Sequence, residues 1–406
     1  MKFLFVLDSV ENPTAANPRL GRVLGAALAK RGHQVHLLEL WDGHNPPPHL
    51  SGLTAHPLAF ADEYQMNRAL ENGAKQGSPL PLRLARLALH PTGVAAAFRQ
   101  LVLHKPRRTE ESRRAIERLD RMEHFDWVVA VAAPYRAAFA LETAQIGGRK
   151  ALWQLDPYGG NRDYQAPGGY AREAQLLTAL DAAFITAQAV PDYADGAPLA
   201  AMRGKVTALG FPCLQPVPAV GPVSDPPRCV FCGSLYPGLR EPRYALRLFR
   251  ELNDPTLQLH FAGNGWQPFA DDAQAAEAVL GQRLVRHGPV PAAEATALQQ
   301  SAAVLLSLGN TVDNQLPSKL FEYFALGKPI LHLCATPGDP ALPYLQRYPL
   351  ALVLHESTPT AETVPTLRRW LTEVRDRQVP YETVTTLYPE FTADGVAEAF
   401  LAGLPA

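Results

Sequence analysis

A short stretch near the C-terminal end combines a hydroxyl, a cation and a carboxylate at the start of one predicted helix. It reads LPSKLFEYFALGKPI, residues 316–330. Ser318 and Lys319 stand at the expected helix start, where unpaired N–H groups and a partial positive charge hold phosphate oxygens well. Glu322 follows three residues later, so it projects from the same face about one turn away and can accept hydrogen bonds from ribose hydroxyls. The three residues predict a site for a nucleoside diphosphate.

The rest of this stretch has the pattern of an ordinary buried helix. Pro317 and Ser318 are a start signal, and Gly327 followed by Pro329 is a stop signal. The apolar stripe of the helix consists of Leu320, Phe321, Phe324 and Ala325. A structural helix needs only this apolar stripe. The stripe does not account for Lys319 and Glu322, so we interpret these two residues as contacts to a ligand.

Length and composition favour a soluble globular protein of two domains. The 406 residues exceed one ordinary hydrophobic core. The formal net charge of −1 gives no reason to expect a nucleic-acid partner. The apolar N-terminus, MKFLFVLDSV, is too short for a secretory signal and is better interpreted as a first buried strand. No segment reaches the roughly 18 uninterrupted apolar residues of a membrane span.

Cysteine usage fits a reducing compartment and predicts a cytoplasmic protein. The chain has four cysteines. Cys229 and Cys232 have CxxC spacing, but no second pair accompanies them and they lie in an apolar run. We therefore expect buried strand thiols here, rather than a zinc or redox site.

Short apolar runs alternate with amphipathic segments along the whole chain, which is typical of parallel sheets covered on both faces. Between residues 212 and 227 the alternation stops, and six prolines indicate a linker. We predict an α/β protein with two doubly wound, Rossmann-like domains that face a central cleft. The expected strands are 2–7, 34–40, 126–134, 150–156 and 181–189 before the linker, and 228–234, 256–263, 283–288, 302–308, 328–334 and 350–356 after it.

The segment 83–121 differs from the rest of the chain in its charge. It holds ten Lys and Arg residues against four Asp and Glu residues. Its arginines alternate with Leu, Val and Phe at helical spacing. Two interpretations remain: a solvated helix face, or a patch that rests on anionic lipid and makes the protein peripheral at the inner face of a membrane.

The segment 316–330 resembles the donor-site helix of GT-B glycosyltransferases, above all the bacterial group 1 glycosyltransferases. The family pattern is Pro-Ser-Lys-Leu-x-Glu-Tyr-x-Ala-x-Gly-Lys-Pro followed by a hydrophobic strand. A chance structural helix would not be expected to match at so many positions. The matching residues are Pro317, Ser318, Lys319, Leu320, Glu322, Tyr323, Ala325, Gly327, Lys328 and Pro329.

The likeness continues at the start of the second half. FCGSLYPGLREP, residues 231–242, is similar to the strand and loop that open the family's donor domain. This resemblance implies that Gly233, Ser234 and Arg240 face the phosphates of the donor.

Two further segments of the second half resemble the family. LHFAGNGW is similar to the strand that ends in Gly-x-Gly, here Gly263 and Gly265, although such a pair fits a simple tight turn equally well. The next unit of the family reads the base edge through its backbone, which maps onto His287 to Val290. His287 alone also fits an ordinary strand-end histidine.

In the first half, LWQLDPYGGN resembles the strand-end segment whose acidic residue faces the acceptor. The resemblance makes Asp156 the candidate catalytic residue, while Asp before Pro is also a common turn opener. The loop SVENPTAANPRLG has Ala15 and Ala16 where the family often has paired glycines, and Arg19 in this loop could face the acceptor. Many retaining members carry a second Glu eight residues before the one that matches Glu322. Asn314 stands there instead, where its amide can still bind a sugar hydroxyl.

The resemblance implies a cytoplasmic glycosyltransferase. The domain 1–211 would bind the acceptor, a glycan or a lipid-linked molecule, and the domain 228–385 would bind a nucleotide-diphospho-sugar. A last helix in 386–406 would cross back to the first domain. No Asp-x-Asp signature stands out, so we expect neither a cofactor nor an essential metal. The alternatives are a nucleotide-sugar 2-epimerase of the same fold, and a catalytically degenerate nucleotide-sugar-binding protein.

Overall fold

The computed structural model describes residues 1–10, 15–43, 50–60, 66, 79–101, 107–160, 168–217, 222–313, 316–317 and 319–405. The chain divides into two compact units. Unit 1 comprises Met1–Pro212 together with Ala393–Ala406, and unit 2 comprises Cys213–Thr392. The predicted linker 212–227 therefore falls almost entirely within unit 2. The return of the chain to unit 1 begins at Ala393, later than the predicted residue 386.

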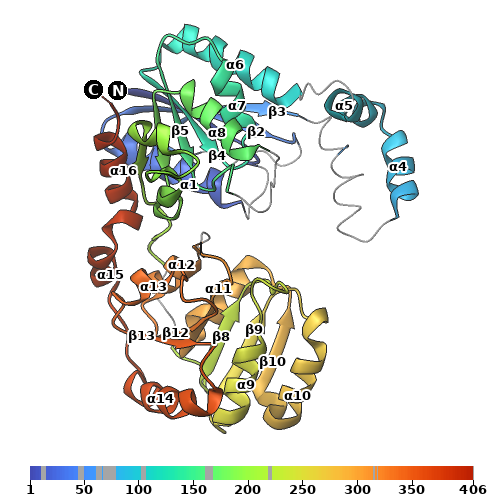
Figure 1. Ribbon diagram of the computed structural model, residues 1–406, viewed down its shortest axis with the longest axis vertical. Coiled ribbons are helices and arrows are strands. Elements are labelled where there is room, and N and C mark those ends of the chain that lie inside the picture. The colour runs from blue at the N-terminus through green and yellow to red at the C-terminus, as the bar shows by residue number, and fades with distance from the viewer. Residues whose placement is uncertain are drawn as a thin grey trace. The chain divides into compact units, whose positions relative to one another are not determined.

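Unit 1 is built on a seven-stranded sheet with the order β3-β2-β1-β4-β5-β6-β7 (Figure 1). All of its neighbouring strands run parallel. Strands β3 and β7 were not expected from the sequence, because β3 has no buried residue and β7 has only three residues. The strands are β1 (Lys2–Leu7), β2 (Gln34–Trp41), β3 (Thr54–Ala59), β4 (Trp127–Ala132), β5 (Arg149–Gln154), β6 (Ala182–Ile185) and β7 (Val206–Ala208).

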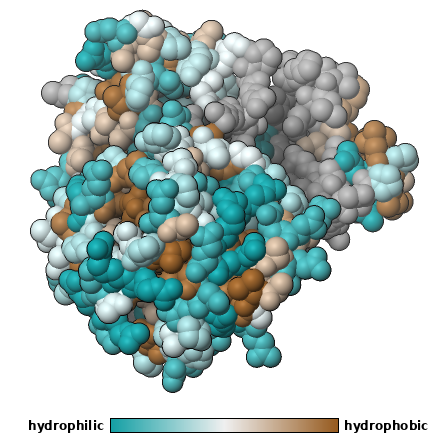
Figure 2. Space-filling view, turned by 60° about the horizontal axis from the view of Figure 1, so that its bottom comes forward, coloured by the Kyte–Doolittle hydropathy of each residue, from teal (hydrophilic) through white to brown (hydrophobic). Residues whose placement is uncertain are grey.

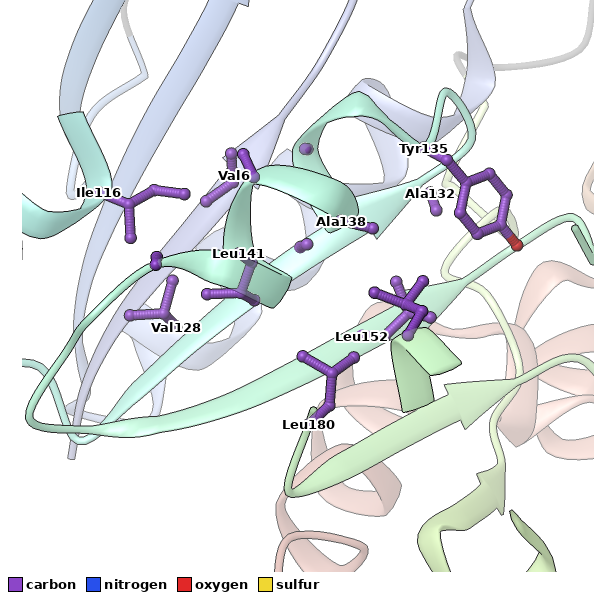
Figure 3. Close-up of a cluster of buried hydrophobic side chains, with 14 of the residues drawn as sticks. Val6, Ile116, Val128, Ala132, Tyr135, Ala138, Leu141, Leu152 and Leu180 are labelled. Carbon is purple, nitrogen blue, oxygen red and sulfur yellow. The ribbon is translucent and has the colours of Figure 1, made fainter. Parts of the chain in front are cut away.

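Helices cover both faces of this sheet. Three of them, α6, α7 and α8, pack on the core cluster drawn in Figure 3, which includes Val6, Val128 and Leu152. The C-terminal helix α16 packs on strand residues that do not belong to this cluster. Its Phe400 contacts the rings of Phe3, Phe5 and Phe184. The helices are α1 (Ala16–Lys30), α4 (Leu80–Ala88), α5 (Pro91–Leu101), α6 (Arg107–Glu123), α7 (Arg136–Thr143), α8 (Gly169–Thr178), the 3₁₀ helices η2 (Ala187–Tyr193) and η3 (Ala200–Lys205), and α16 (Ala393–Ala402).

Unit 2 has a six-stranded parallel sheet with the order β10-β9-β8-β11-β12-β13. Each of its strands lies within a range expected from the sequence. Cys229 and Cys232 are buried in β8, and burial raises the pKa of both thiols, so the expectation of buried strand thiols is confirmed. The strands are β8 (Arg228–Cys232), β9 (Gln258–Ala262), β10 (Leu284–Gly288), β11 (Val304–Leu308), β12 (Ile330–Cys334) and β13 (Ala351–His355).

The helices of unit 2 connect these strands. None of the helices in the described ranges of either unit is long and apolar enough to cross a membrane. The helices are α9 (Arg243–Leu252), α10 (Ala270–Leu280), α11 (Ala292–Ser301), α12 (Lys319–Leu326), α13 (Leu342–Leu345), α14 (Thr360–Glu373) and α15 (Tyr381–Leu387), with the 3₁₀ helices η4 (Gln267–Phe269), η5 (Gly281–Arg283) and η6 (Pro389–Phe391).

The two sheets confirm the predicted α/β class with two doubly wound units. In each sheet the strand order runs outward in both directions from one central pair, β1 and β4 in unit 1 and β8 and β11 in unit 2. The connections leave these two strands toward opposite sides, so a crevice forms outside their carboxyl ends. Each unit therefore has one favoured place for a ligand.

The carboxyl group of Glu356, directly after β13, predicts how stability depends on pH. Burial raises its pKa from the ordinary 4.5 to about 7, an effect that Arg247 opposes and Glu241 reinforces. The folded state therefore binds this proton more tightly, and the contribution of Glu356 to the free energy of unfolding should fall as the pH rises from about 4.5 through about 7. The difference in this free energy between the wild type and Glu356→Gln should therefore shift against the wild type between pH 5 and pH 8, as measured by denaturant unfolding. Glu362→Gln, an exposed carboxylate on α14, is the control. Identical pH dependence of all three proteins would contradict this assignment.

Candidate functional site

Aromatic packing fixes the position of helix α12. The ring of Phe321 lies 3.9 Å from that of Phe391, and Phe324 stacks on Tyr388 with ring centroids 4.5 Å apart. These contacts bury one face of the helix, as its apolar stripe predicts. The other face keeps Lys319 and Glu322 partly exposed, with Nζ and Oε2 3.8 Å apart. The helix ends before Gly327, whose φ is +69° and where a Cβ would overlap the carbonyl oxygen of Val379.

A pocket of about 230 Å³ lies at the carboxyl ends of β8 and β11, beside the first turn of α12. This is the switch point of the unit 2 sheet, where the rule for doubly wound folds places a ligand. Its wall consists of Phe231, Cys232, Arg240, Leu306, Ser307, Leu308, Pro317, Lys319, Leu320 and Tyr323. A volume of this size accommodates part of a nucleotide rather than a whole nucleotide-sugar.

Two cations line this pocket, and both were expected from the sequence. Lys319 comes from the start of α12, and Arg240 comes from the loop after β8. Arg240 donates from Nε to Oδ1 of the buried Asn310 at 3.0 Å, which fixes the direction of its guanidinium group. Burial lowers the pKa of Arg240, but a guanidinium remains charged near neutral pH. Two cations in one wall suit the two phosphates of a diphosphate.

The Gly-x-Gly pair shapes the loop beside this pocket. At Gly263 (φ +148°) a Cβ would overlap the carbonyl oxygen of Gly233, and at Gly265 (φ +97°) it would overlap that of Leu235. The two loops are also joined by backbone hydrogen bonds, Gly233 N–H to Ala262 at 2.9 Å and Leu235 N–H to Asn264 at 2.8 Å. The glycines thus allow the loop after β8 to lie against the loop after β9.

The other residues predicted for the donor site lie at different distances from the pocket. Gly233 and Ser234 directly follow the lining residue Cys232, but neither lines the pocket itself. The ring of His287 faces His260, with Nε2 and Nδ1 3.0 Å apart, and Val290 is half-buried between β10 and α11. The ring of His287 is thus engaged within the protein, and a contact of this segment's backbone with a base stays a prediction.

Two predicted residues, Ser318 and Asn314, lie outside the residues that the structure describes.

A buried array of hydrogen-bonded side chains includes one residue of the pocket wall, Ser307. The sequence analysis did not identify this array. His332 contacts Ser307 Oγ through Nδ1 and Asp339 through Nε2, each at 3.0 Å, and Asp339 accepts the N–H of Ala341 at 2.8 Å. Ser307 is one of the pocket residues. His332, Asp339 and Cys334 could also reach a single metal ion, but Cys334 donates its thiol to the carbonyl of Thr336. The array connects β11, its neighbour β12 and the loop that follows β12.

In unit 1 the predicted catalytic residue, Asp156, is exposed two residues beyond the end of β5. Its carboxylate accepts a hydrogen bond from Asn17 Nδ2 at 3.4 Å, and its carbonyl accepts one from the Tyr135 hydroxyl at 2.6 Å. Asn17 Nδ2 also donates to the carbonyl of Ala133 at 2.7 Å. The carboxylate therefore stands at the edge formed by the ends of β4 and β5, close to the first turn of α1.

A buried carboxylate supports the loop that carries Asp156. Glu173 is 1% exposed. It accepts hydrogen bonds from the Gly159 N–H at 2.6 Å, from Gln154 Nε2 at 2.6 Å and from the Tyr193 hydroxyl at 2.9 Å. Three donors on one buried carboxylate compensate its desolvation and fix the backbone after β5.

A second charged cluster lies at the same edge, directly after β1. The buried Asp8 accepts from Arg136 Nε at 2.9 Å, and Arg108 Nε lies 3.4 Å from its other oxygen. Arg19, predicted for the acceptor side, is exposed in the first turn of α1. Asp8 could have been singled out from the sequence, because it directly follows a buried strand, β1, of the parallel sheet whose strand β5 precedes Asp156.

No family model matches the chain, and no curated protein does either. Solved structures do match it over nearly its whole length. The galactosyltransferase WaaB of the lipopolysaccharide outer core is 14% identical, with a TM-score of 0.55 and 99% of each chain covered. Anabaena HepE in complex with UDP is 12% identical, with a TM-score of 0.58 and the same coverage. The chain has a GT-B fold.

This GT-B fold is also found in a protein of another activity. A Listeria monocytogenes protein assigned as a UDP-N-acetylglucosamine 2-epimerase is 13% identical, with a TM-score of 0.53, and covers 99% of this chain and 95% of its own. At such identities the likeness shows the fold alone. The reaction must therefore be argued from the residues of the two units.

The contact between the two loops of this GT-B protein predicts the effect of one substitution. Gly263→Ala should lower the melting temperature and weaken binding of a nucleoside diphosphate, because its Cβ would push the Gly233 carbonyl and displace the loop beside the pocket. Calorimetry and thermal unfolding measure both effects.

The matched control for Gly263→Ala is Gly281→Ala. Gly281 also has a positive φ, +56°, but nothing lies within 4 Å of a Cβ there. We expect Gly281→Ala to cost roughly 1–3 kcal/mol of backbone strain, because its φ of +56° and ψ of −130° suit glycine alone, and to leave binding unchanged. Equal behaviour of the two variants would show that loop contact is not the reason for Gly263.

Proposed function

We propose that this protein is a glycosyltransferase that moves a sugar from a nucleotide-diphospho-sugar to a glycan or lipid-linked acceptor. The observation that carries the proposal is the pocket at the β8–β11 switch point, with Lys319 and Arg240 in its wall. The shared fold supports it, and one structure of HepE was solved with both UDP and glucose. Unit 2 is the donor unit in this proposal, and unit 1 is the acceptor unit.

The donor site works through charge and helix geometry. The diphosphate lies at the N-terminus of α12, where Lys319, Arg240 and the backbone amides stabilise the charge that grows as the nucleoside diphosphate departs. Glu322 accepts hydrogen bonds from the ribose, and the hydroxyl of Ser318 adds a donor. Because two cations and a helix dipole face the phosphates, we propose that no divalent metal is required.

The acceptor side works through Asp156. Its carboxylate accepts the proton of the acceptor hydroxyl as that oxygen attacks the anomeric carbon, while the bond from this carbon to the phosphate oxygen breaks. In a retaining reaction the same carboxylate would orient the acceptor instead. Glu173 and Tyr135 are positioning residues, since they hold the loop that carries Asp156.

One experiment separates this reaction from the two alternatives. The protein is incubated with a panel of UDP-, GDP- and ADP-linked sugars, with and without candidate acceptors. A glycosyltransferase releases nucleoside diphosphate, and an acceptor accelerates the release. An epimerase changes the sugar without net release of nucleotide, and a degenerate binding protein turns over nothing. Either of these last two results would overturn the proposed function.

Two substitutions on α12 test the donor site. Lys319→Ala should weaken nucleoside diphosphate binding by about tenfold to a hundredfold, because a charge-assisted contact to phosphate is worth roughly 1.5–3 kcal/mol. It should leave the affinity for the nucleoside nearly unchanged. Glu322→Gln should weaken the binding of both, since both contain ribose. Calorimetry with UDP, GDP and ADP in the presence of EDTA measures these changes and the proposed independence from metal.

The matched control is Arg369→Ala on α14, an exposed cation that lies 3.9 Å from Glu373 one turn along its helix. It should bind every nucleotide like the wild type. If Lys319→Ala or Glu322→Gln also binds all three nucleotides like the wild type, the donor site is assigned wrongly.

Asp156→Asn tests the acceptor side. Turnover should fall by roughly 10²–10⁴-fold, because an amide cannot accept the proton, while donor affinity stays near that of the wild type. Asp195→Asn, at a carboxylate that is 95% exposed in unit 1, is the control. A lower melting temperature with turnover within a few-fold of the wild type would show that Asp156 only opens a turn.

A further inference from the structure

Exposed apolar side chains concentrate in the α4–α5 hairpin, defined here as residues 79–101. Twelve large hydrophobic side chains are exposed in the described part of the chain, and six of them lie in this short segment. Leu89 is the most exposed of the twelve, at 77%. Brown side chains lie beside teal ones at the right edge of Figure 2, where α4 is found. The six residues are Leu80, Leu82, Leu84, Leu89, Val94 and Phe98.

The packing of the hairpin leaves these side chains without cover. Leu87 of α4, Ala97 of α5 and Met66 form a small buried cluster that joins the two helices. Leu80 and Leu84 are four residues apart and share one side of α4. Leu82 and Leu89, the residue that caps the C-terminal end of α4, are seven residues apart and share the opposite side. The helix therefore presents apolar side chains in two directions.

The charge of the hairpin is of one sign. Residues 79–101 contain Arg83, Arg86 and Arg99, and no Asp or Glu. Two copies of this surface would repel each other, which argues against a symmetric contact between two chains. An anionic lipid surface offers the complementary charge next to an apolar layer.

The neighbouring helix α6 is also rich in arginine, and three of its arginines have acidic partners within the protein. Arg113 pairs with Glu110 and Glu117, at 2.7 and 2.6 Å. Arg114 pairs with Glu110 at 3.0 Å, and Arg108 is buried beside Asp8. The basic segment 83–121 is therefore not one surface, and the part of it that suits a lipid layer is narrower than its charge count predicts.

We propose that the α4–α5 hairpin inserts its leucines into an anionic lipid leaflet, with the arginines of α4, Arg83 and Arg86, at the level of the headgroups. Apolar insertion provides most of the affinity, and charge selects the leaflet. The inference deepens the proposed function, because it names the surface on which a lipid-linked acceptor would be met. It concerns unit 1 alone and does not depend on the donor pocket.

The test is co-sedimentation of the full chain with vesicles of phosphatidylcholine alone and of phosphatidylcholine mixed with phosphatidylglycerol. The wild type should bind the anionic vesicles, and added salt should weaken this binding without abolishing it. Leu82→Ser and Leu89→Ser should each lower the affinity by about tenfold. These side chains are exposed, so both variants should keep the wild-type melting temperature.

Two control variants and one independent measurement, nucleoside diphosphate binding, complete the test. Met122→Ser removes an exposed apolar side chain from α6 and should bind vesicles like the wild type. Arg114→Gln should do the same, because that arginine pairs with Glu110. All variants should bind nucleoside diphosphates equally, so a failure of the hairpin is distinguishable from a failure of the donor site.

Three results would overturn the proposal. The first is equal binding of the wild type to neutral and anionic vesicles, or no binding to either. The second is vesicle binding that Leu82→Ser and Leu89→Ser leave unchanged. The third is a dimer in sedimentation velocity that these two substitutions dissociate, because the occupant of the surface would then be a second copy of the chain.

Discussion

The burial of Phe321 and Phe324 is the constraint on which the donor side of this protein depends. These rings pack on Phe391 and Tyr388, which fixes both the position and the rotation of α12. With one face of the helix held in this way, Lys319 must project from the other face at the helix start. That start lies at the ends of β8 and β11, so one packing interaction places a cation, a helix dipole and a pocket together.

The second constraint is the parallel arrangement of both sheets. Residues that directly follow different strands meet at one edge, although they are far apart in sequence. In unit 2 this brings the loop of Arg240 to the start of α12. In unit 1 it brings Asp8, after β1, to the edge that carries Asp156, after β5. The carboxyl-end edge of each sheet carries polar residues that do not occur within its buried strands. Buried groups such as Glu173 hold the connecting loops in place.

The sequence predicts more of the fold than of the site, for physical reasons. Buried strands are continuous apolar runs and were found, whereas β3 and β7 have no buried residue and so have no such signal. Lys319 and Arg240 could be predicted because each stands in a continuous segment that resembles a family motif. The array of Ser307, His332 and Asp339 depends on register between strands, which no local pattern reveals. The pairing within α6 could have been predicted, because its Glu and Arg residues are three and four apart.

The central claim is that a nucleoside diphosphate binds at the edge where β8, β11 and α12 meet. Hydrogen–deuterium exchange of the wild-type protein with and without saturating UDP, GDP or ADP tests it most directly. The account predicts slower exchange with at least one of these nucleotides in two segments, the loop after β8 around residues 233–240 and the first turn of α12. It also predicts no change in α4 and α5. Protection confined to unit 1, or no protection at α12 with any nucleotide that binds, would contradict it.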